Sequence, residues 1–475
     1  MNRRHFLHSV SATFSTAALG PWGAGCTSGG ELHPTGPTLG GIPSDPWWNR
    51  GNYAPVSEEV ESLNLTVEGS IPPELNGVFL RNGANPASGS SPHWFLGDGM
   101  VHAVRIGDGE AHWYRNRWIQ THALGDSNND NPAANRANTN LIHYADRVLA
   151  LYEIGIPYEL DPLTLATQGE YDFERALEGP MSAHPKQDPT NLHLGFIGYS
   201  PVRPYLRFHE ADSDGLLLNS AIIDIPRPTM MHDFQLTPNY AVILDLPVAF
   251  DLSTADSGFP FVWSPDAGAR IGLVSRAAPS ETPQWFDIDL GFMFHTFNAH
   301  EDPQGRVVLE GCRVPSLWAD SVADATQTPT PWRWTLDPRS GSSREGAFES
   351  IGVDFPMIDA RRQGQANKLN YGLLLRGGDE NYPTHPTGLI KHTRASATTE
   401  VWSYGDTHQP DEALFIPYGD AEDDGYLMTM VYSRQDGRSE VHIFDASQIE
   451  NGPLAKIQMP RRVPFGFHGC WVPLD

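Results

Sequence analysis

The chain has 475 residues and a formal net charge of −26. This acidic balance argues against a nucleic-acid partner, which needs a basic face, and it disfavours attraction to anionic lipid headgroups. Hydrophobic residues make up 39% of the chain and charged residues 19%, an ordinary globular balance with ample material for a core. The 45 glycines and 40 prolines are spread along the chain, which indicates many turns and therefore many short strands.

The first thirty residues resemble an export signal. Residues 3–7 hold two adjacent arginines, one spacer and then Phe-Leu, as in the twin-arginine signal, and apolar and small residues follow over 10–25. That stretch is too short and too rich in Ser and Thr for a membrane span. We predict a twin-arginine signal peptide over residues 1–30 and a periplasmic or otherwise extracytoplasmic location. A frayed N-terminal helix is the alternative.

Cys26 follows Gly23-Ala24-Gly25, which resembles a lipoprotein cleavage site. The usual aliphatic residue three positions before the cysteine is replaced by Gly23, so lipid anchoring through Cys26 stays open. Residues 31–47 are rich in Gly, Pro, Ser and Thr and are predicted to form a flexible linker. No internal boundary follows, so residues 48–475 are predicted to form one domain.

After residue 48 the sequence consists of short apolar runs broken by turns. The runs are rich in β-branched and aromatic residues and are flanked by Gly, Pro, Asp or Asn, which is typical of strands. Examples lie at 77–81, 101–106, 147–152, 240–244, 305–309 and 441–444. Residues 58–63 and 172–177 are predicted to form short helices. The pattern favours a large all-β fold, which can be a sandwich, a barrel array or a propeller.

Cys312 and Cys470 are the two cysteines beyond the leader. A disulfide between them is compatible with an oxidising compartment, but pairing cannot be deduced from sequence.

Four of the 19 histidines have unusual settings, namely His184, His232, His295 and His468. Each is flanked by apolar or small residues, which predicts that it is at least partly buried. Burying an imidazole without a partner is costly, so these four should be paired or bound to something.

The separations between these histidines are 48, 63 and 173 residues. They are too long for a local metal loop, whose ligands lie within about 20 residues of one another. They suit a radial site, in which different blades of a propeller each present one ligand at a common axis. With blades of about 40–50 residues or somewhat more, the spacings correspond to about one, one and three blades.

The contexts of the four histidines, in this order, resemble the iron-ligand motifs of the carotenoid cleavage oxygenases. Further stretches resemble the same family, at 76–83, 97–102, 138–140, 160–162, 422–426 and 464–469. The resemblance implies a seven-bladed β-propeller, one Fe(II) held by His184, His232, His295 and His468, and a cap of loops and short helices over the metal axis. His300 competes with His295, but the family pattern Phe-His-x-x-Asn favours His295.

The resemblance also implies three carboxylates that hold the second nitrogens of the ligand histidines. Glu153 matches the first of these positions and Glu412 the last. Asp354 stands where the family usually has glutamate. Because aspartate is one methylene shorter, either the backbone lies closer or a water bridges the gap. Four neutral imidazoles would leave up to two coordination positions open for dioxygen, the expected co-substrate, or for water.

The implied reaction adds dioxygen across one C=C bond and gives two carbonyl products, with no catalytic residue required beyond the metal centre. One branch of the family cleaves carotenoids or apocarotenoids. Another cleaves stilbenes and typically has a lysine beside the first carboxylate, where this chain has Tyr152. We therefore predict an apolar polyene as substrate. A lignostilbene-like substrate and a non-catalytic, metal-containing binding propeller are the alternatives, and no obligate protein partner is evident.

Leu252, Phe259, Phe261 and Trp263 lie in a Pro- and Gly-rich segment where the family often has an apolar entrance to its substrate tunnel. We predict that Phe259, Phe261 and Trp263 line the tunnel or its entrance together with Tyr152. The segment is further expected to touch a membrane peripherally, and packing in the core is the alternative.

Overall fold

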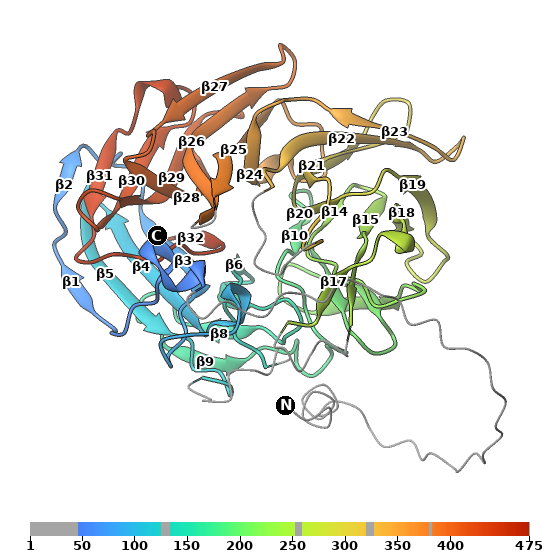
Figure 1. Cartoon of the computed structure of the whole chain (residues 1–475), viewed down its shortest axis with the longest axis horizontal. Helices are drawn as coiled ribbons and strands as arrows, with labels where there is room; N and C mark the ends of the chain where they lie inside the picture. The colour runs from blue at the N-terminus through green and yellow to red at the C-terminus, as the bar shows by residue number, and fades with distance from the viewer. Residues whose placement is uncertain (1–45, 125–133, 252–258, 320–326, 380–381, 475) are drawn as a thin grey trace.

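Strands in the described parts of the chain form seven antiparallel sheets of four or five strands, arranged as blades around a central axis (Figure 1), and one further two-stranded sheet. The computed structural model describes residues 46–124, 134–251, 259–319, 327–379 and 382–474. Helix is confined there to 3-10 turns at Trp47–Asn49 (η1), Gly51–Tyr53 (η2), Trp94–Leu96 (η3), Pro265–Ala267 (η5), Ala360–Arg362 (η6) and Ile449–Asn451 (η7). The prediction of an all-β, seven-bladed propeller is confirmed. The predicted leader and residues 31–45 of the predicted linker lie outside the described residues.

Blades 1 to 4 come first along the chain, except that strand β32 (Gly469–Pro473) of blade 1 comes from its C-terminal part. Blade 1 contains β3 (Gly77–Ala84), β4 (Gly99–Gly107) and β5 (Glu110–Trp118), flanked by β1 (Glu61–Leu63) and β32. Blade 2 contains β6 (Asn140–Tyr144), β7 (Arg147–Leu151), β8 (Tyr158–Leu160) and β9 (Thr167–Glu170). Blade 3 contains β10 (Lys186–Gln187), β11 (Leu194–Tyr199), β12 (Leu206–Ala211) and β13 (Leu217–Ile222). Blade 4 contains β14 (Phe234–Leu236), β15 (Tyr240–Asp245), β18 (Ala269–Ser275) and β19 (Gln284–Ile288), and a hairpin of β16 (Val248–Phe250) and β17 (Phe261–Trp263) lies between β15 and β18 in the chain.

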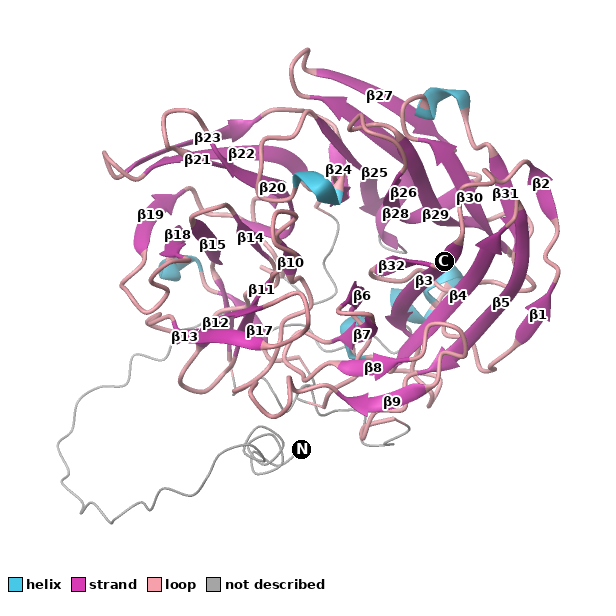
Figure 2. Cartoon of the chain, turned by 180° about the vertical axis from the view of Figure 1, so that it is seen from behind, coloured by secondary structure: helices cyan, strands magenta, loops and turns pink. Residues whose placement is uncertain are grey.

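Blades 5 to 7 follow in the second half of the chain, and Figure 2 shows the same ring from behind. Blade 5 contains β20 (Phe292–Glu301), β21 (Val307–Val314), β22 (Thr330–Asp337) and β23 (Ser342–Ala347). Blade 6 contains β24 (Gly352–Met357), β25 (Leu369–Asp379), β26 (Tyr382–Thr393) and β27 (Thr398–Ser403). Blade 7 contains β28 (His408–Pro417), β29 (Gly425–Ser433), β30 (Ser439–Asp445) and β31 (Ala455–Gln458), with β2 (Val67–Gly69) at its outer edge.

The ring closes where β32 pairs antiparallel with β3. The register runs from Gly77 opposite Pro473 to Arg81 opposite Gly469. Blade 1 therefore combines strands from both ends of the domain, and strand β2 from the beginning of the domain completes blade 7. Because β32 is the innermost strand of blade 1, this pairing carries the residue before it, His468, to the axis.

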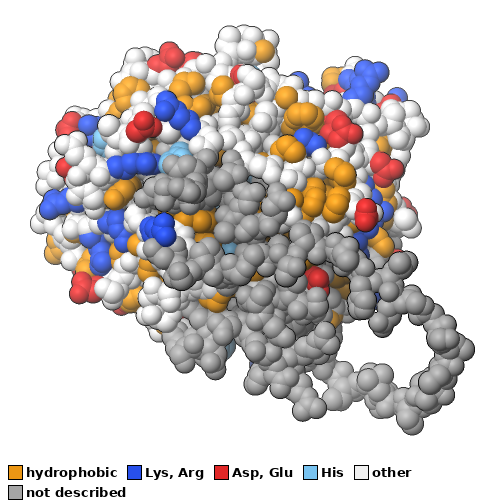
Figure 3. Space-filling model, in the orientation of Figure 1, with side chains coloured by type: hydrophobic (Ala, Val, Ile, Leu, Met, Phe, Trp, Pro, Cys, Tyr) orange, Lys and Arg blue, Asp and Glu red, His pale blue; other side chains and the backbone are white. Residues whose placement is uncertain are grey.

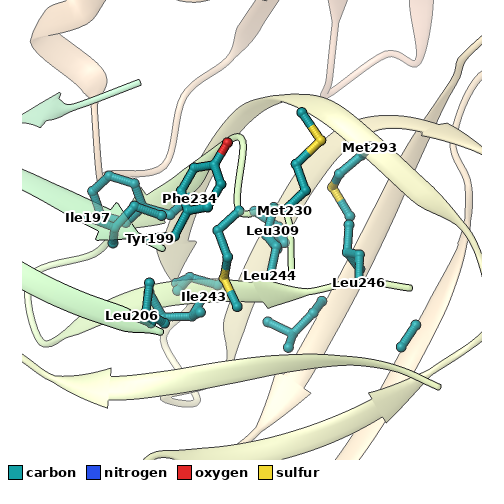
Figure 4. Close-up of a cluster of buried hydrophobic side chains, with 14 of the residues drawn as sticks. Ile197, Tyr199, Leu206, Met230, Phe234, Ile243, Leu244, Leu246, Met293 and Leu309 are labelled. Atoms are coloured by element: carbon teal, nitrogen blue, oxygen red, sulfur yellow. The ribbon is translucent and has the colours of Figure 1, made fainter. Parts of the chain in front are cut away.

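The core lies between neighbouring blades, where apolar side chains of adjacent sheets pack against each other. The largest cluster joins blades 3, 4 and 5 and contains fully buried Ile197, Leu206, Phe234, Ile243 and Leu309 (Figure 4). Burying an aliphatic or aromatic side chain of this size contributes roughly 1.5–3 kcal/mol. Such packing fixes the blades relative to one another, so residues on the inner strands have defined positions at the axis.

The six strands quoted from the sequence are confirmed, but the two predicted short helices are wrong. All six quoted apolar runs lie in or overlap strands, namely β3, β4, β7, β15, β21 and β30. Residues 61–63, by contrast, form the edge strand β1, which pairs with β5. Residues 172–177 form a turn, because Phe173, Glu174 and Arg175 have φ of 54°, 57° and 70°, in the left-handed region that no right-handed helix uses.

The face in Figure 3 carries both acidic and basic side chains, with several basic ones on its left side. Within the described residues, no helix has the length and apolar character needed to cross a bilayer.

Cys312 and Cys470 are free thiols, so the disulfide that the sequence analysis left open does not form.

Candidate metal centre

The four predicted histidines meet at the propeller axis, where one nitrogen of each lies within 4.8 Å of one nitrogen of each of the others. His184 and His232 shortly precede β10 and β14, His295 lies in β20, and His468 precedes β32. They therefore lie in or just before the innermost strands of blades 3, 4, 5 and 1, in steps of one, one and three blades as the spacing predicts. His300 pairs with Val308 farther along β20 and is not in the cluster.

Three of the histidines face one another through their Nε2 atoms. His295 Nε2 lies 3.3 Å from His232 Nε2 and 3.2 Å from His468 Nε2. Two imidazole nitrogens bound at a right angle to one ion, each about 2.1 Å from it, would be about 3 Å apart. The observed separations are close to that value.

Carboxylates contact the other ring nitrogens of these histidines. His295 Nδ1 lies 2.7 Å from Asp354 Oδ1, and His468 Nδ1 lies 2.7 Å from Glu412 Oε1. A carboxylate accepts a hydrogen bond from Nδ1–H, and in the neutral ring this leaves the lone pair on Nε2. Lone pairs that face each other repel unless a cation lies between them. The pairing with Asp354 and Glu412 therefore leaves the Nε2 lone pairs of His295 and His468 available to bind a metal.

His232 has a similar partner in Glu153. His232 Nδ1 lies 2.9 Å from Glu153 Oε1, at an angle that departs from that of a hydrogen bond. The other carboxylate oxygen of Glu153 accepts a hydrogen bond from the Tyr199 hydroxyl. Tyr199 therefore fixes the carboxylate that orients His232.

Every blade contributes one residue to this arrangement. Glu153 follows β7 of blade 2, Asp354 lies in β24 of blade 6, and Glu412 lies in β28 of blade 7. These are the three blades that supply no histidine. The site is therefore assembled from the whole ring.

Asp354 reaches His295 directly although its side chain is short. The register of β24 against β25 shifts between Asp354 and Met357, and Phe355 has a φ of 49°. A β-bulge bends the strand that carries it and re-aims a side chain. Of the two sequence-based alternatives, closer backbone and bridging water, the backbone is the one observed.

Glu412 is held in its charged form. Arg81, which is only 1% exposed, donates to Glu412 at 3.0 Å and also pairs with Asp411. Burial alone would raise the pKa of Glu412, but His468, Arg81 and the Gly469 backbone N–H outweigh it and lower that pKa. Glu412 therefore remains a carboxylate that can accept from His468.

His184 differs from the other three because no carboxylate of the described residues pairs with it. Its Nε2 is buried and makes no hydrogen bond. Burial, reinforced by His232, His468 and His295, lowers the pKa of His184 well below its usual range, so the ring is neutral. A neutral, buried imidazole nitrogen without a partner is suited to ligate a metal.

The group as a whole fits a first-row transition metal. Imidazole nitrogens suit iron, copper, zinc and nickel, and carboxylates that contact the outer nitrogens are the usual support of such ligands. Burial lowers the pKa of His468 against the opposing effect of Glu412. Asp354 outweighs burial at His295 and raises its pKa.

A pocket with a water-accessible volume of about 170 Å³ lies against His232, His295 and His468. Its walls are mainly aromatic, formed by Trp47, Trp94, Phe95, Phe259, Phe261, Phe294, Trp318, Phe355, Phe465 and Phe467. Among the described residues no lysine or arginine lines it, and its carboxylates are Glu153 and Asp354. The pocket is therefore suited to an apolar, uncharged molecule.

The predicted tunnel residues fall into two groups. Tyr152, Phe259 and Phe261 line the pocket, whereas Trp263 is not among the lining residues. Leu252, from the same segment, lies outside the described part of the chain. Phe259 is only 3% exposed, so it packs in the wall and does not face lipid. Phe261 and Trp263 are both half-buried.

Sequence reasoning did not name several wall residues, including Trp47, Trp94 and Trp318. They come from distant segments, and Trp94 and Phe95 lie in η3 just before the Gly-Asp-Gly stretch at 97–99. The aromatic residues beside that motif were the one feature of the sequence that could have indicated these wall residues.

Comparisons with known proteins agree with this geometry. The family model described as retinal pigment epithelial membrane protein matches residues 53–473. A carotenoid cleavage oxygenase of Mycobacterium tuberculosis is 31% identical, over 89% of this chain and 97% of the relative. An isoeugenol monooxygenase of Pseudomonas nitroreducens is 28% identical, again over 89% of this chain and 97% of the relative.

Solved structures show the same likeness. The lignostilbene dioxygenase of Pseudomonas brassicacearum has a TM-score of 0.82 and 27% identity, covering 91% of this chain and 99% of the other. Cobalt-substituted Synechocystis ACO has a TM-score of 0.80 and 26% identity, covering 90% and 98%.

Proposed function

The chain belongs to the family of the retinal pigment epithelial membrane protein and the carotenoid cleavage oxygenases, and from this premise we propose that it holds one Fe(II) and cleaves a C=C bond of a carotenoid or apocarotenoid into two carbonyl products. That it is an enzyme of the oxidative cleavage type follows from the family. The metal, the co-substrate O2 and the substrate are the proposed parts.

One observation carries the proposal. His295 Nε2 lies 3.2–3.3 Å from the Nε2 atoms of His232 and His468 beside an aromatic pocket, and a carboxylate contacts the Nδ1 of each of the three rings. His184 completes the group. Bound iron would supply the activation of dioxygen, a reaction that side chains alone do not perform.

The protein's own residues bind, orient and shield. Glu153, Asp354 and Glu412 orient the rings of His232, His295 and His468 and favour the proton on Nδ1. The aromatic walls exclude water and align a flat, conjugated molecule against the histidines. No side chain needs to act as a general acid or base.

Tyr152 supports the polyene branch over the stilbene branch. It lines the pocket at 5% exposure, and burial raises its pKa to about 12, so it is a neutral hydroxyl where a stilbene cleaver typically has a cationic lysine. A neutral wall suits a hydrocarbon chain better than a phenolate.

A phenolic substrate is the second candidate. Its support is the likeness to lignostilbene dioxygenase and isoeugenol monooxygenase, together with the high aromatic content of the pocket. A binding propeller without turnover is less well supported, because all four histidines and all three carboxylates are in place.

Product analysis by mass spectrometry tests these candidates. Iron-loaded protein is incubated under oxygen with β-carotene, an apocarotenal, a hydroxystilbene and isoeugenol, beside a His232→Ala control. We expect aldehydes from a polyene, absent in the control. Cleavage of the phenolic substrates alone would overturn the choice of branch, and no cleavage by iron-loaded protein would favour the binding propeller.

Export by the twin-arginine route is a further proposal, resting on residues 3–7. Replacing Arg3 and Arg4 with lysine should retain the protein in the cytoplasm, as fractionation would measure. Replacing Cys26 with serine should release the protein from membranes if Cys26 is acylated.

Peripheral membrane contact through Phe261 and Trp263 is proposed because both are half-buried, whereas a residue packed in the core would be closed to lipid. Changing both to serine should weaken binding to liposomes. Unchanged binding would refute this part of the proposal.

A further inference from the structure

Asp233 joins three of the four histidine-bearing segments. It follows His232 directly and is 2% exposed. Its Oδ1 lies 2.7 Å from Lys186 Nζ, two residues after His184. Its Oδ2 accepts hydrogen bonds from the Thr296 backbone N–H at 2.9 Å and from the Thr296 hydroxyl at 2.6 Å, one residue after His295.

The carboxylate of Asp233 is fully engaged in these contacts. Oδ1 also accepts from the backbone N–H of Phe234 at 2.8 Å. A charged, buried carboxylate with fixed donors on three sides is a rigid junction, and removing one partner of such a pair is strongly destabilising.

The junction extends toward blade 6. Gln235 Nε2 donates to the Thr296 hydroxyl oxygen at 2.8 Å, and Gln363 Nε2 donates to Gln235 Oε1 at 2.6 Å. A buried network in which each member is satisfied specifies one arrangement of its segments. Blades 3, 4, 5 and 6 are thereby locked together beside the histidines.

We propose that Asp233 is a positioning residue for the metal site and that, through Lys186, it holds His184, the one histidine without a carboxylate of its own. The inference rests on the proposed metal site. His232, His295 and His468 are oriented by carboxylates at their rings. His184 is instead oriented through its backbone, because Lys186 is anchored two residues away.

The test is metal affinity measured on the full-length protein after metal removal. Apo protein is titrated with Co(II) against a chromophoric chelator, and the visible absorption spectrum of the bound Co(II) is recorded. Asp233→Asn and Lys186→Met should each lower the affinity roughly 10–100-fold, the usual range for groups that support metal ligands, and should change the Co(II) spectrum.

Asp98→Asn is the matched control. Asp98 is likewise 2% exposed and accepts from buried Arg136 at 2.9 Å, but it contacts none of the histidine segments. It should lose thermal stability as Asp233→Asn does and keep the wild-type Co(II) affinity and spectrum. A purely structural role for Asp233 would make the two variants alike.

Thr296→Val covers the case in which Asp233→Asn does not fold. It removes one of the two Thr296 donors and keeps the backbone N–H, so a loss of about 3–10-fold is expected, below the range for a whole supporting group. Wild-type affinity and an unchanged spectrum in the variants would overturn the inference. Failure of the wild type itself to bind Co(II) would instead overturn the metal site on which it rests.

Discussion

Replacing Asp354 with glutamate should weaken the metal site, although glutamate is the residue that the family usually has there. The carboxylate of Asp354 already lies 2.7 Å from His295 Nδ1, and a bulge at Phe355 brings it there. One added methylene lengthens the side chain by about 1.5 Å, so the carboxylate must turn away or push the ring. Either displacement breaks a charge-assisted hydrogen bond worth about 1.5–3 kcal/mol.

That energy corresponds to about a 10–100-fold loss of metal affinity, the range found for such supporting groups. The assay is the Co(II) titration described above, with Asp354→Asn as the companion variant. Asparagine keeps the length and loses the charge, so it should retain more affinity than glutamate. If the Asp354→Glu variant binds Co(II) as tightly as the wild type, the idea that the bulge is matched to the shorter side chain is refuted.

Three further predictions concern buried groups. Burial lowers the pKa of His209 to about 3, so between pH 6.5 and 3 this residue takes up a proton in the unfolded chain but not in the folded chain. His209 should therefore contribute a fall of about 1.4 kcal/mol per pH unit to the free energy of unfolding. His209→Leu should remove this slope in denaturant unfolding, whereas replacing His122, which is 89% exposed, with glutamine should not. Arg81→Met removes the buried cation that pairs with both Asp411 and Glu412 and should cost about 3–5 kcal/mol of stability; a loss below 1 kcal/mol would contradict that pairing. Tyr199→Phe removes the donor to Glu153 and should lower Co(II) affinity by less than about tenfold, with unchanged affinity arguing that Glu153 needs no such support.

The sequence predicted the site better than it predicted the walls around it. His184, His232, His295 and His468, with their carboxylates, sit in short local motifs, and a motif can be read without knowing the fold. The direct contact of Asp354 with His295 could not be predicted from the sequence. It depends on the positive φ of Phe355, and the residue types at these positions do not indicate such a backbone conformation.

Contacts between distant segments were also beyond sequence reasoning. Lys186 and Asp233 are remote in sequence and meet only because blades 3 and 4 are adjacent. Trp47 and Trp318 are likewise distant in sequence, and they line one pocket only because the folded ring brings their segments together. Strand runs were recognised because burial on both faces leaves an apolar run, whereas the turn at 172–177 has a composition that also suits a helix.

The pairing of β3 with β32 would make binding of the proposed metal and closure of the ring mutually dependent. His468 lies directly before β32, and its backbone is fixed by hydrogen bonds with Asn82 and Thr139. If β32 separates from β3, His468 leaves the other three histidines, so a bound ion opposes opening of the ring at this seam. Amide hydrogen exchange along β32 should therefore slow when metal binds, while exchange in outer strands such as β13 stays unchanged. Removal of the proposed metal should therefore be detected first at this seam.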